Sequence, residues 1–572
     1  MSTGAIPFKA QMTAGAPGRE SSHAFLGHAK RIGLLTLASR VLGMARESVA
    51  AGVFGSGVVW SAFTVAFTVP NLFRKLLGEG ALSAAFIPLY AQAMDADPAE
   101  ANRFAAASVN LLAVILAALT IAGELILGAL LLLHPRADQA LTIKLTAVML
   151  PYVVLVCGAA FLGGVLQVHR RFNLPAASPS ILNVVHIVVI MAGAWMIGLR
   201  GSHGQIEMQK QTVLVYWLAG FVLLAGGLQI VMLLPSLKAV GFRFDPRAAI
   251  WTPAVRKMVK LSIPVALSAG VLQLSVLIDK GITVFLSQGM DASGHLISRF
   301  TLFGHNIAYP MQIGAVARLN WAQFLYQFPL GIFAIAIATA IFPRLAADAM
   351  ENGREKFRAA LHSGIFATLL EGLPASLGLI LVRYPAIRLL WEHGNFTPND
   401  TMWVARSVVL YSAAIWAYSL QQILNRAYYA MHDTVTPLIW SIVTIVVNTV
   451  VEIPLVFTSL GEAGMAAGTL VSFAIQAVVM LILLDRTVGG LDLRRIGIGT
   501  MKMLAGCGAM AGACWLVEKT PLFPAGRGMI ASAVQLVILM AVGAGAYLGT
   551  CSALGLNVRE HLLHAGHGKM TR

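Results

Sequence analysis

Long apolar runs separated by short polar loops dominate the 572-residue chain. A helix needs about 20 apolar residues to cross a bilayer, and about fourteen runs approach that length, some of them interrupted by Gly, Pro or a charge. Their approximate limits are 33–55, 59–92, 104–134, 139–168, 177–199, 212–235, 258–290, 318–342, 358–385, 401–428, 434–459, 462–485, 497–518 and 526–552. The pattern predicts an all-α polytopic membrane protein with about 14 transmembrane helices and no soluble domain.

Composition also indicates a lipid environment. The chain is 58% hydrophobic and 12% charged, whereas a soluble protein carries about twice that charged fraction. The net charge of +16 is scattered between apolar runs instead of clustering on one domain, so we expect no nucleic-acid partner. The four cysteines stand in apolar runs without ligand spacing, and we expect no metal site.

Basic residues are divided unequally between alternate loops. Loops on the side of both termini hold about 25 Lys and Arg, and the opposite loops hold about eight. Since Lys and Arg accumulate in cytoplasmic loops, both termini are predicted to be cytoplasmic. Residues 1–30 are read as a tail without a cleaved signal peptide. Residues 236–257 are a cytoplasmic linker that could equally be an amphipathic surface segment.

The first two apolar runs carry many charges at membrane depth. Arg40, Arg46 and Glu47 lie in the first run, and Arg74 and Glu79 lie in the second. Because unpaired buried charges are costly, a water-filled cavity that binds an anion explains the arginines well. A guanidinium group suits phosphate or carboxylate recognition. The alternative is that Arg46–Glu47 and Arg74–Glu79 are ion pairs near the helix ends.

Helix-breaking residues accompany these charges. Gly43 lies between the two arginines of the first run, and Pro70, Asn71 and Gly80 lie around Arg74 in the second. We expect these positions to act as structural hinges, because sharp bends in helices occur at Pro and at Gly. A bend at Gly43 would bring both arginines of the first run into one cavity.

Further ionisable residues at membrane depth are Asp279, Lys280, Arg318, Glu371 and Glu452. Asp279 and Lys280 are adjacent, so their side chains point about 100° apart and cannot neutralise each other along one face. Glu371 and Glu452 each lie close to a proline. They are candidate sites for a coupling Na⁺ or H⁺, with structural hydrogen bonding as the alternative.

Catalytic signatures of the HExxH, GxSxG or P-loop type do not occur in the sequence. His169 and His305 stand without catalytic partners. We therefore expect a transporter without catalytic residues or cofactors. A membrane-embedded transferase and a scaffold are the alternatives from other classes.

The charged N-terminal segment contains three specific motifs: TLASRVLGMARE (36–47), AFTVAF (62–67) and PNLFRKLLGEGALSAAFIP (70–88). Supporting motifs are YQFPLG (326–331), ATAIFP (338–343), GNFT (394–397), RAYYA (426–430) and DTVTP (433–437). In this order, over about residues 31–490, the sequence resembles the MurJ (MviN) family of lipid II flippases, which belongs to the MOP superfamily.

The resemblance implies two six-helix lobes around a central cationic cavity and two C-terminal helices that form a groove for a lipid tail. The corresponding segments are 1–30 (N-terminal tail), 31–235 (first lobe), 236–257 (linker), 258–490 (second lobe), 491–552 (last two helices) and 553–572 (cytoplasmic C-terminal tail). Arg40, Arg46 and Arg74 match the family's cavity arginines, and Glu47 and Glu79 match its acidic partners.

The implied function is the movement of lipid II, an undecaprenyl-diphosphate-linked peptidoglycan precursor, from the inner to the outer leaflet of a bacterial inner membrane. Alternating access would be biased by the membrane potential or by a coupling cation. The partners would be lipid II, membrane lipids and proteins of cell-wall synthesis. The alternative within transport is a flippase for another polyprenyl-linked oligosaccharide. A cation-coupled drug exporter is disfavoured, because it would need an acidic and aromatic pocket.

Two positions depart from the family pattern. Ser61 stands where many members have Asp, and Phe324 stands where they have Arg. Lys280 or Arg318 could supply the missing cation. We favour Lys280, because Arg318 lies six residues before Phe324, about 9 Å along a helix and on another face. The acidic neighbour Asp279 is assigned to the cavity with Lys280.

Overall fold

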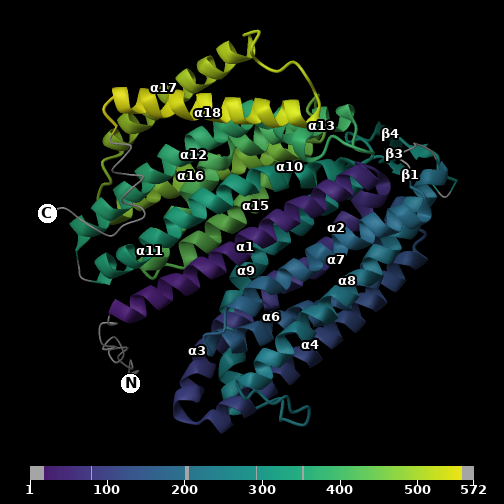
Figure 1. Cartoon of the computed structure of the whole chain (residues 1–572), viewed down its shortest axis with the longest axis vertical. Coiled ribbons are helices and arrows are strands. Elements are labelled where there is room, and N and C mark those ends of the chain that lie inside the picture. The colour runs from purple at the N-terminus through teal and green to yellow at the C-terminus, as the bar shows by residue number, and fades with distance from the viewer. Residues whose placement is uncertain (1–18, 79, 200–204, 292, 351–352, 557–572) are drawn as a thin grey trace.

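The computed structural model describes residues 19–78, 80–199, 205–291, 293–350 and 353–556, and shows two helical lobes side by side (Figure 1). Glu79 and most of both predicted tails lie outside the described residues. The first lobe contains α1 (Arg19–Phe54), α2 (Val58–Phe73), η1 (Arg74–Gly78, a π-helical turn), α3 (Ala81–Ala96), α4 (Pro98–Leu132), α5 (Ala137–Met149), α6 (Tyr152–Val168), α7 (Asn173–Ile197) and α8 (Gln205–Ala239).

Helix α9 (Pro253–Leu286) packs against α3 of the first lobe and α15 of the second. The second lobe contains α10 (Ala315–Pro329), η2 (Leu330–Ala334, π-helical), α11 (Ile335–Met350), α12 (Arg354–Leu390), α13 (Pro398–Ala413), α14 (Ile415–Ala430), α15 (Val435–Val456) and α16 (Ala463–Val488). The last helices, α17 (Leu493–Glu518) and α18 (Met529–Ala553), pack on α12 at the far side of the second lobe (Figure 1).

Each predicted apolar run coincides with a helix or with a broken helix, which confirms the helical membrane fold. The second, fourth, eighth and tenth runs are the broken ones, and the α5–α6 pair bends by 44°. Within the described ranges, nine helices are long and apolar enough to span a membrane by themselves, or ten with that bent pair. The number of fourteen crossings therefore stays a prediction.

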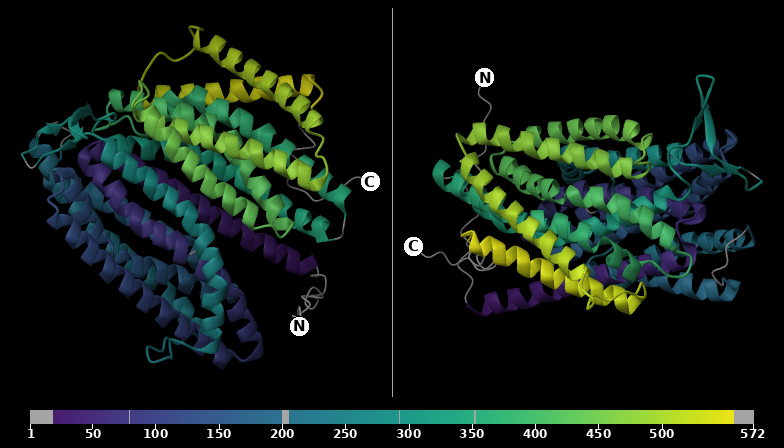
Figure 2. Two further views of the ribbon diagram at one scale, coloured as in Figure 1. Left: turned by 180° about the vertical axis from the view of Figure 1, so that it is seen from behind. Right: turned by 90° about the horizontal axis from the view of Figure 1, so that it is seen from above.

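Two small antiparallel sheets lie between α9 and α10 of the otherwise helical fold. Strands β1 (Gly289–Met290) and β2 (Leu296–Ile297) form one pair, and β3 (Arg299–Leu302) and β4 (His305–Ala308) form the other. The two-residue connection Phe303–Gly304 has positive φ at both positions, 49° and 79°, as a tight hairpin requires. Figure 2 shows this hairpin extending beyond the helices.

Local sequence signals explain several helix ends. Asp97 caps α4 by accepting a hydrogen bond from the backbone N–H of Ala99 at 2.8 Å, and Pro98 follows at the first helical position. Thr397 and Asp400 form a reciprocal capping box at the start of α13. Helix α7 stops at Gly198, whose φ of 70° is left-handed. The loops thus set the helix limits that hydropathy leaves imprecise.

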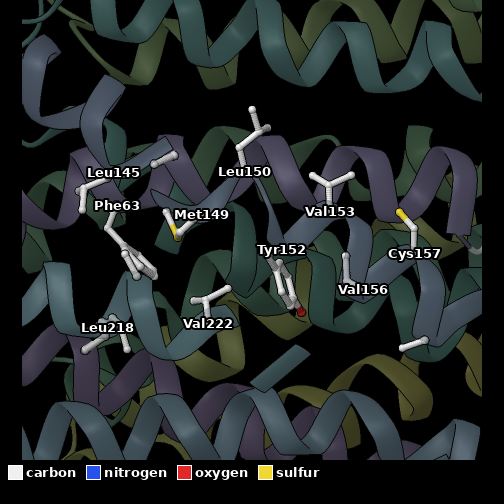
Figure 3. Packing of buried hydrophobic residues seen from close by; sticks show 14 of the residues in the cluster. Phe63, Leu145, Met149, Leu150, Tyr152, Val153, Val156, Cys157, Leu218 and Val222 are labelled. Carbon is white, nitrogen blue, oxygen red and sulfur yellow. The ribbon is translucent and has the colours of Figure 1, made fainter. Parts of the chain in front are cut away.

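The first lobe is held together by buried apolar side chains from four helices (Figure 3). Phe63 of α2, Met149 of α5, Tyr152 of α6 and Leu218 of α8 are each at most 3% exposed. Large apolar side chains also cover the outside of the bundle, for example Trp195 at 83% exposure. An apolar exterior of this kind fits a protein surrounded by lipid.

The helical bundle has two ends, which we call the inner end and the outer end. The inner end is where α1 begins and α18 ends, and the outer end is where α1 ends and the strands lie (Figure 2).

Candidate functional site

Three neighbouring cavities lie in the first lobe and at its interface with the second lobe. Together we call them the cationic groove. The first, of about 400 Å³, lies within the first lobe, and the second, of about 180 Å³, lies between the lobes. The third, of about 490 Å³, lies between α1 and the second lobe. The first two share Arg46 and Asn71, and the last two share Phe324 and Gln327, so the three cavities are neighbours.

The first cavity is lined by polar groups from several helices. Arg46 of α1 and Arg74 of η1 supply positive charge, and Asn71, Asn183 and Gln229 supply amide groups. A site with two guanidinium groups and several amide donors is suited to an anion. The sequence-predicted residues Arg46, Asn71 and Arg74 are therefore brought together.

The third cavity contains the other predicted arginine. Arg40 and Lys75 line it with Phe324, Gln327 and Gly331 of the second lobe. A Cβ atom at Gly331 would lie 2.5 Å from Arg40 Nη1, so glycine at this position of η2 allows the guanidinium group to cross close to the backbone. Lys75 is a groove residue that sequence reasoning did not assign.

Helix α1 runs unbroken through Gly43, which differs from the bend expected there. Asn183 Nδ2 donates to the Ser39 carbonyl at 3.2 Å, and a Cβ atom at Gly43 would lie 3.7 Å from the same Nδ2 atom. Gly43 thus lies where α7 packs on α1, and the two arginines reach different cavities from one straight helix.

The predicted break around Arg74 is present. The turn η1 begins at Arg74, four residues after Pro70, and α3 starts after Gly80. A Cβ atom at Gly80 would lie 2.5 Å from the Lys75 carbonyl oxygen, so only glycine fits this close approach. The break places Arg74 and Lys75 on different cavities.

Glu47 is paired with Arg46, as the alternative interpretation of the sequence allowed. Arg46 Nη2 lies 2.5 Å from Glu47 Oε1, and Trp321 Nε1 of α10 donates to Glu47 Oε2 at 3.1 Å. The Arg46 side chain keeps 17% of its surface exposed, and Glu47 keeps 6%. Glu47 thus joins the lobes while Arg46 still lines two cavities.

The lobes are in close contact at the outer end, and we call this contact the outer closure. The backbone N–H of Asn395 donates to the Gly52 carbonyl at 2.8 Å, and Asn395 Nδ2 donates to the Val53 carbonyl at 2.7 Å. Gly394 has φ of 60°, and a Cβ atom there would lie 2.2 Å from the Gly52 oxygen. A side chain at Gly394 would therefore force this contact apart.

Arg318 belongs to the outer closure and lines none of the three cavities. Its Nη2 and Nε atoms lie 2.7 and 2.9 Å from the carboxylate oxygens of Glu462, and both residues are at most 3% exposed. Arg318 Nη1 also donates to Ser56 Oγ at 3.3 Å, and Ser56 donates to Asp400. The pair occupies Arg318, and the expected role in substrate binding finds no geometric support.

Two predicted carboxylates meet between α9 and α15. Asn448 Nδ2 donates to Glu452 Oε2 at 2.9 Å and to Asp279 Oδ1 at 3.2 Å, while Ser472 Oγ lies 3.4 Å from Asn448 Oδ1. Glu452 is 0% exposed, and its Oε1 atom has no hydrogen-bond partner within the described part of the chain. Oxygen ligands in this arrangement could hold a small cation or a proton.

The two remaining predicted residues, Lys280 and Glu371, do not line the groove. Lys280 Nζ lies 3.4 Å from Asn320 Oδ1, and Asn320 lines the second cavity, so Lys280 is one side chain away from the groove. Glu371 lies on α12 and lines none of the three cavities. Uncharged lining residues such as Asn320 and Gln327 were missed, because a lone amide gives no signal in an apolar run.

The chain is similar to known proteins over most of its length. Residues 50–523 match the family model described as lipid II flippase MurJ. A probable lipid II flippase MurJ of Rhizobium meliloti (strain 1021) is 31% identical over 458 residues, covering 78% of each chain. One from Bdellovibrio bacteriovorus is 29% identical over 533 residues, covering 91% of this chain and 93% of the relative.

Solved structures show the same fold. A lipid II flippase MurJ in an inward closed conformation matches with a TM-score of 0.69 at 22% identity, covering 91% of this chain and 98% of the other. An inward-facing multidrug resistance transporter of the MATE family in the MOP superfamily matches with a TM-score of 0.61 at 15% identity. It covers 80% of this chain and 98% of the other.

Proposed function

This chain belongs to the MurJ family of lipid II flippases, and we propose that its cationic groove binds the diphosphate of lipid II. Four cations line the groove. Arg40 and Arg46 belong to α1, and Arg74 and Lys75 belong to η1. Phosphate oxygens accept two parallel hydrogen bonds from one guanidinium group. The three neighbouring cavities, of about 400, 180 and 490 Å³, give room for a head group much larger than a phosphate.

The direction of movement that we propose is from the inner to the outer leaflet, by alternating access. The outer closure seals the lobe interface in this structure, and Arg40 lies about 9 Å from Arg46 along α1 toward the inner end. Separation of Asn395 from Gly52 and of Arg318 from Ser56 would open the outer end. The breaks at η1 and η2 are the helix positions best suited to absorb such a change.

Energy input is proposed to come from a cation or proton held by Asp279 and Glu452, or from the membrane potential acting on the groove. The two carboxylates lie on α9 and α15 and are joined through Asn448. Charge in the groove would feel the potential at about 2.3 kcal/mol per charge per 100 mV. No covalent step is needed, so we propose a transporter and not an enzyme.

The single observation that carries the proposal is the gathering of arginines from α1 and η1 on neighbouring cavities. It is tested with Arg40→Ala, Arg46→Ala and Arg74→Ala made singly in a strain depleted of its own flippase, with lipid II in the outer leaflet measured. Loss of a charged phosphate contact should lower transport by about 10- to 100-fold. Arg103→Ala, which changes an exposed arginine of α4, is the matched control. Normal transport in all three groove variants would overturn the proposal.

A further inference from the structure

A second basic cluster lies at the outer end of α12, on the side covered by α17 and α18. Arg383 and Arg388 belong to α12, and Arg527 lies two residues before α18. Arg527 Nη2 lies 3.4 Å from Glu392 Oε1, and Arg388 Nε lies 3.9 Å from Glu392 Oε2. The guanidinium carbons of Arg383 and Arg388 lie 4.6 and 5.7 Å from the centre of the Tyr384 ring. We call these three arginines the outer arginine cluster.

The cluster has more positive charge than its acidic partner can balance. Arg388 and Arg527 share the carboxylate of Glu392, which also accepts a hydrogen bond from Thr401 Oγ1 at 2.6 Å, while Arg383 donates to the backbone carbonyl of Ile380. Arg388 Nε is buried and makes no hydrogen bond within the described ranges. Basic residues are disfavoured on this side of a membrane protein, so the cluster needs an explanation other than topology.

Exposed apolar side chains lie next to Arg527 in the sequence. Leu522, five residues before Arg527, is 89% exposed. Met529 and Ile530, which follow Arg527, are 62% and 81% exposed. Exposed apolar groups on a membrane protein face hydrocarbon, whereas a free anion would be held in a polar surround. A ligand that satisfies both features has a phosphate and a hydrocarbon chain.

We propose that Arg383, Arg388 and Arg527 bind the phosphate of a lipid at the outer end of the second lobe. The site is separate from the cationic groove, whose arginines come from α1 and η1. Two lipids share this chemistry: the transported prenyl diphosphate after its release, and a resident anionic phospholipid. The outer-leaflet position rests on the proposed function and its orientation, whereas the phosphate site rests on the cluster itself.

The test uses the full chain in phosphatidylcholine nanodiscs with Leu522→Cys carrying an environment-sensitive fluorophore. The four natural cysteines are buried, so the label reports on the cluster alone. Undecaprenyl diphosphate, phosphatidylglycerol and phosphate-free undecaprenol are added separately. We expect a saturable emission change with a phosphate lipid, and Arg383→Gln/Arg527→Gln should raise its midpoint by about tenfold or more. Keeping Arg388 preserves its contact with Glu392, and thermal unfolding checks the fold.

Each outcome decides one part of the proposal. A response to undecaprenyl diphosphate alone identifies the transported lipid as the ligand, and a response to phosphatidylglycerol alone identifies a resident phospholipid. An equal response to undecaprenol, or no effect of the double substitution, would overturn the phosphate site. Arg46→Gln/Arg74→Gln should leave the fluorescence response intact while abolishing lipid II transport. Normal transport in that variant would therefore refute the proposed function without affecting the cluster.

Discussion

The cationic groove and the outer closure both contain intramembrane arginines, but the two regions surround them differently. Arg40 and Arg74 line cavities together with neutral amides. Arg318 instead meets a carboxylate from another helix at 2.7 Å and is 3% exposed. Arg318 is thus held by a carboxylate of the fold, whereas an arginine that lines a cavity is positioned to contact a ligand.

The two lobes also present different side chains to the groove. The first lobe supplies the groove with Arg40, Arg46 and Arg74, while the second lobe presents Phe324 and Gln327 to the same space. Both lobes break a helix by a π-helical turn beside the groove, at η1 and at η2. The corresponding breaks carry different chemistry, so the substrate anion is expected to contact mainly the first lobe.

The largest effect is expected from breaking the Arg318–Glu462 pair. Arg318→Ala leaves the Glu462 carboxylate buried at 1% exposure without its bidentate partner, which should cost about 3–5 kcal/mol of unfolding free energy. Thermal unfolding of the purified chain measures this loss. The double substitution Arg318→Met/Glu462→Leu should recover most of the stability, because it removes both charges.

A surface pair provides the matched control for this comparison. Arg344 Nε lies 3.7 Å from Asp348 Oδ2 on α11, and the Arg344 side chain is 49% exposed. Arg344→Ala should change stability by about 1 kcal/mol or less. Equal, small effects of Arg318→Ala and Arg344→Ala would show that the closure does not depend on the buried pair.

A smaller effect is expected from substitution of Glu452, which is joined to Asp279 through Asn448. Glu452→Gln keeps the shape of the side chain but removes its charge next to Asp279 and Asn448. Lipid II transport into the outer leaflet should fall by about tenfold, an effect of about 1.4 kcal/mol, and lose its response to Na⁺ or to pH. Transport by membrane vesicles over a range of both ions measures this response.

Glu371→Gln is the control for that experiment. Glu371 is the other residue that the sequence suggested for ion coupling, and it lines none of the three cavities. It should leave the ion response unchanged. A Glu452→Gln protein that still responds to the ions as the unsubstituted chain does would exclude Glu452 from coupling.

Much of the fold followed from the sequence, because a span of apolar residues has few structural solutions in lipid. Apolar runs located the helices, and the Pro70–Gly80 segment located one break. Hydropathy did not reveal the break at η2 or the hairpin of β3 and β4. The hairpin depends on local backbone geometry at single residues such as Gly304, whose positive φ leaves little trace in an average over a window.

The site was predictable only in part. Charges at membrane depth directed attention to Arg40, Arg46 and Arg74, which do line cavities. The same reasoning selected Arg318, whose partner Glu462 lies 144 residues away in the sequence and is visible only in three dimensions. The contact between distant helices therefore decides whether a charge packs on a carboxylate or lines a cavity, and no spacing within one helix reports it.

The smallest effect is expected at Lys280, which tests whether the second-lobe side adds any cation to the groove. Lys280 lies 3.4 Å from Asn320, and Asn320 lines the second cavity beside Phe324. A charge one side chain away from the ligand contributes about 1 kcal/mol at an effective protein dielectric, so Lys280→Gln should weaken lipid II binding by about fivefold. Phe324→Arg in the same chain should restore the affinity, because it places a guanidinium group directly on the cavity. Binding is measured with the purified protein in nanodiscs, and an unchanged affinity in Lys280→Gln would mean that the groove draws its positive charge from the first lobe alone.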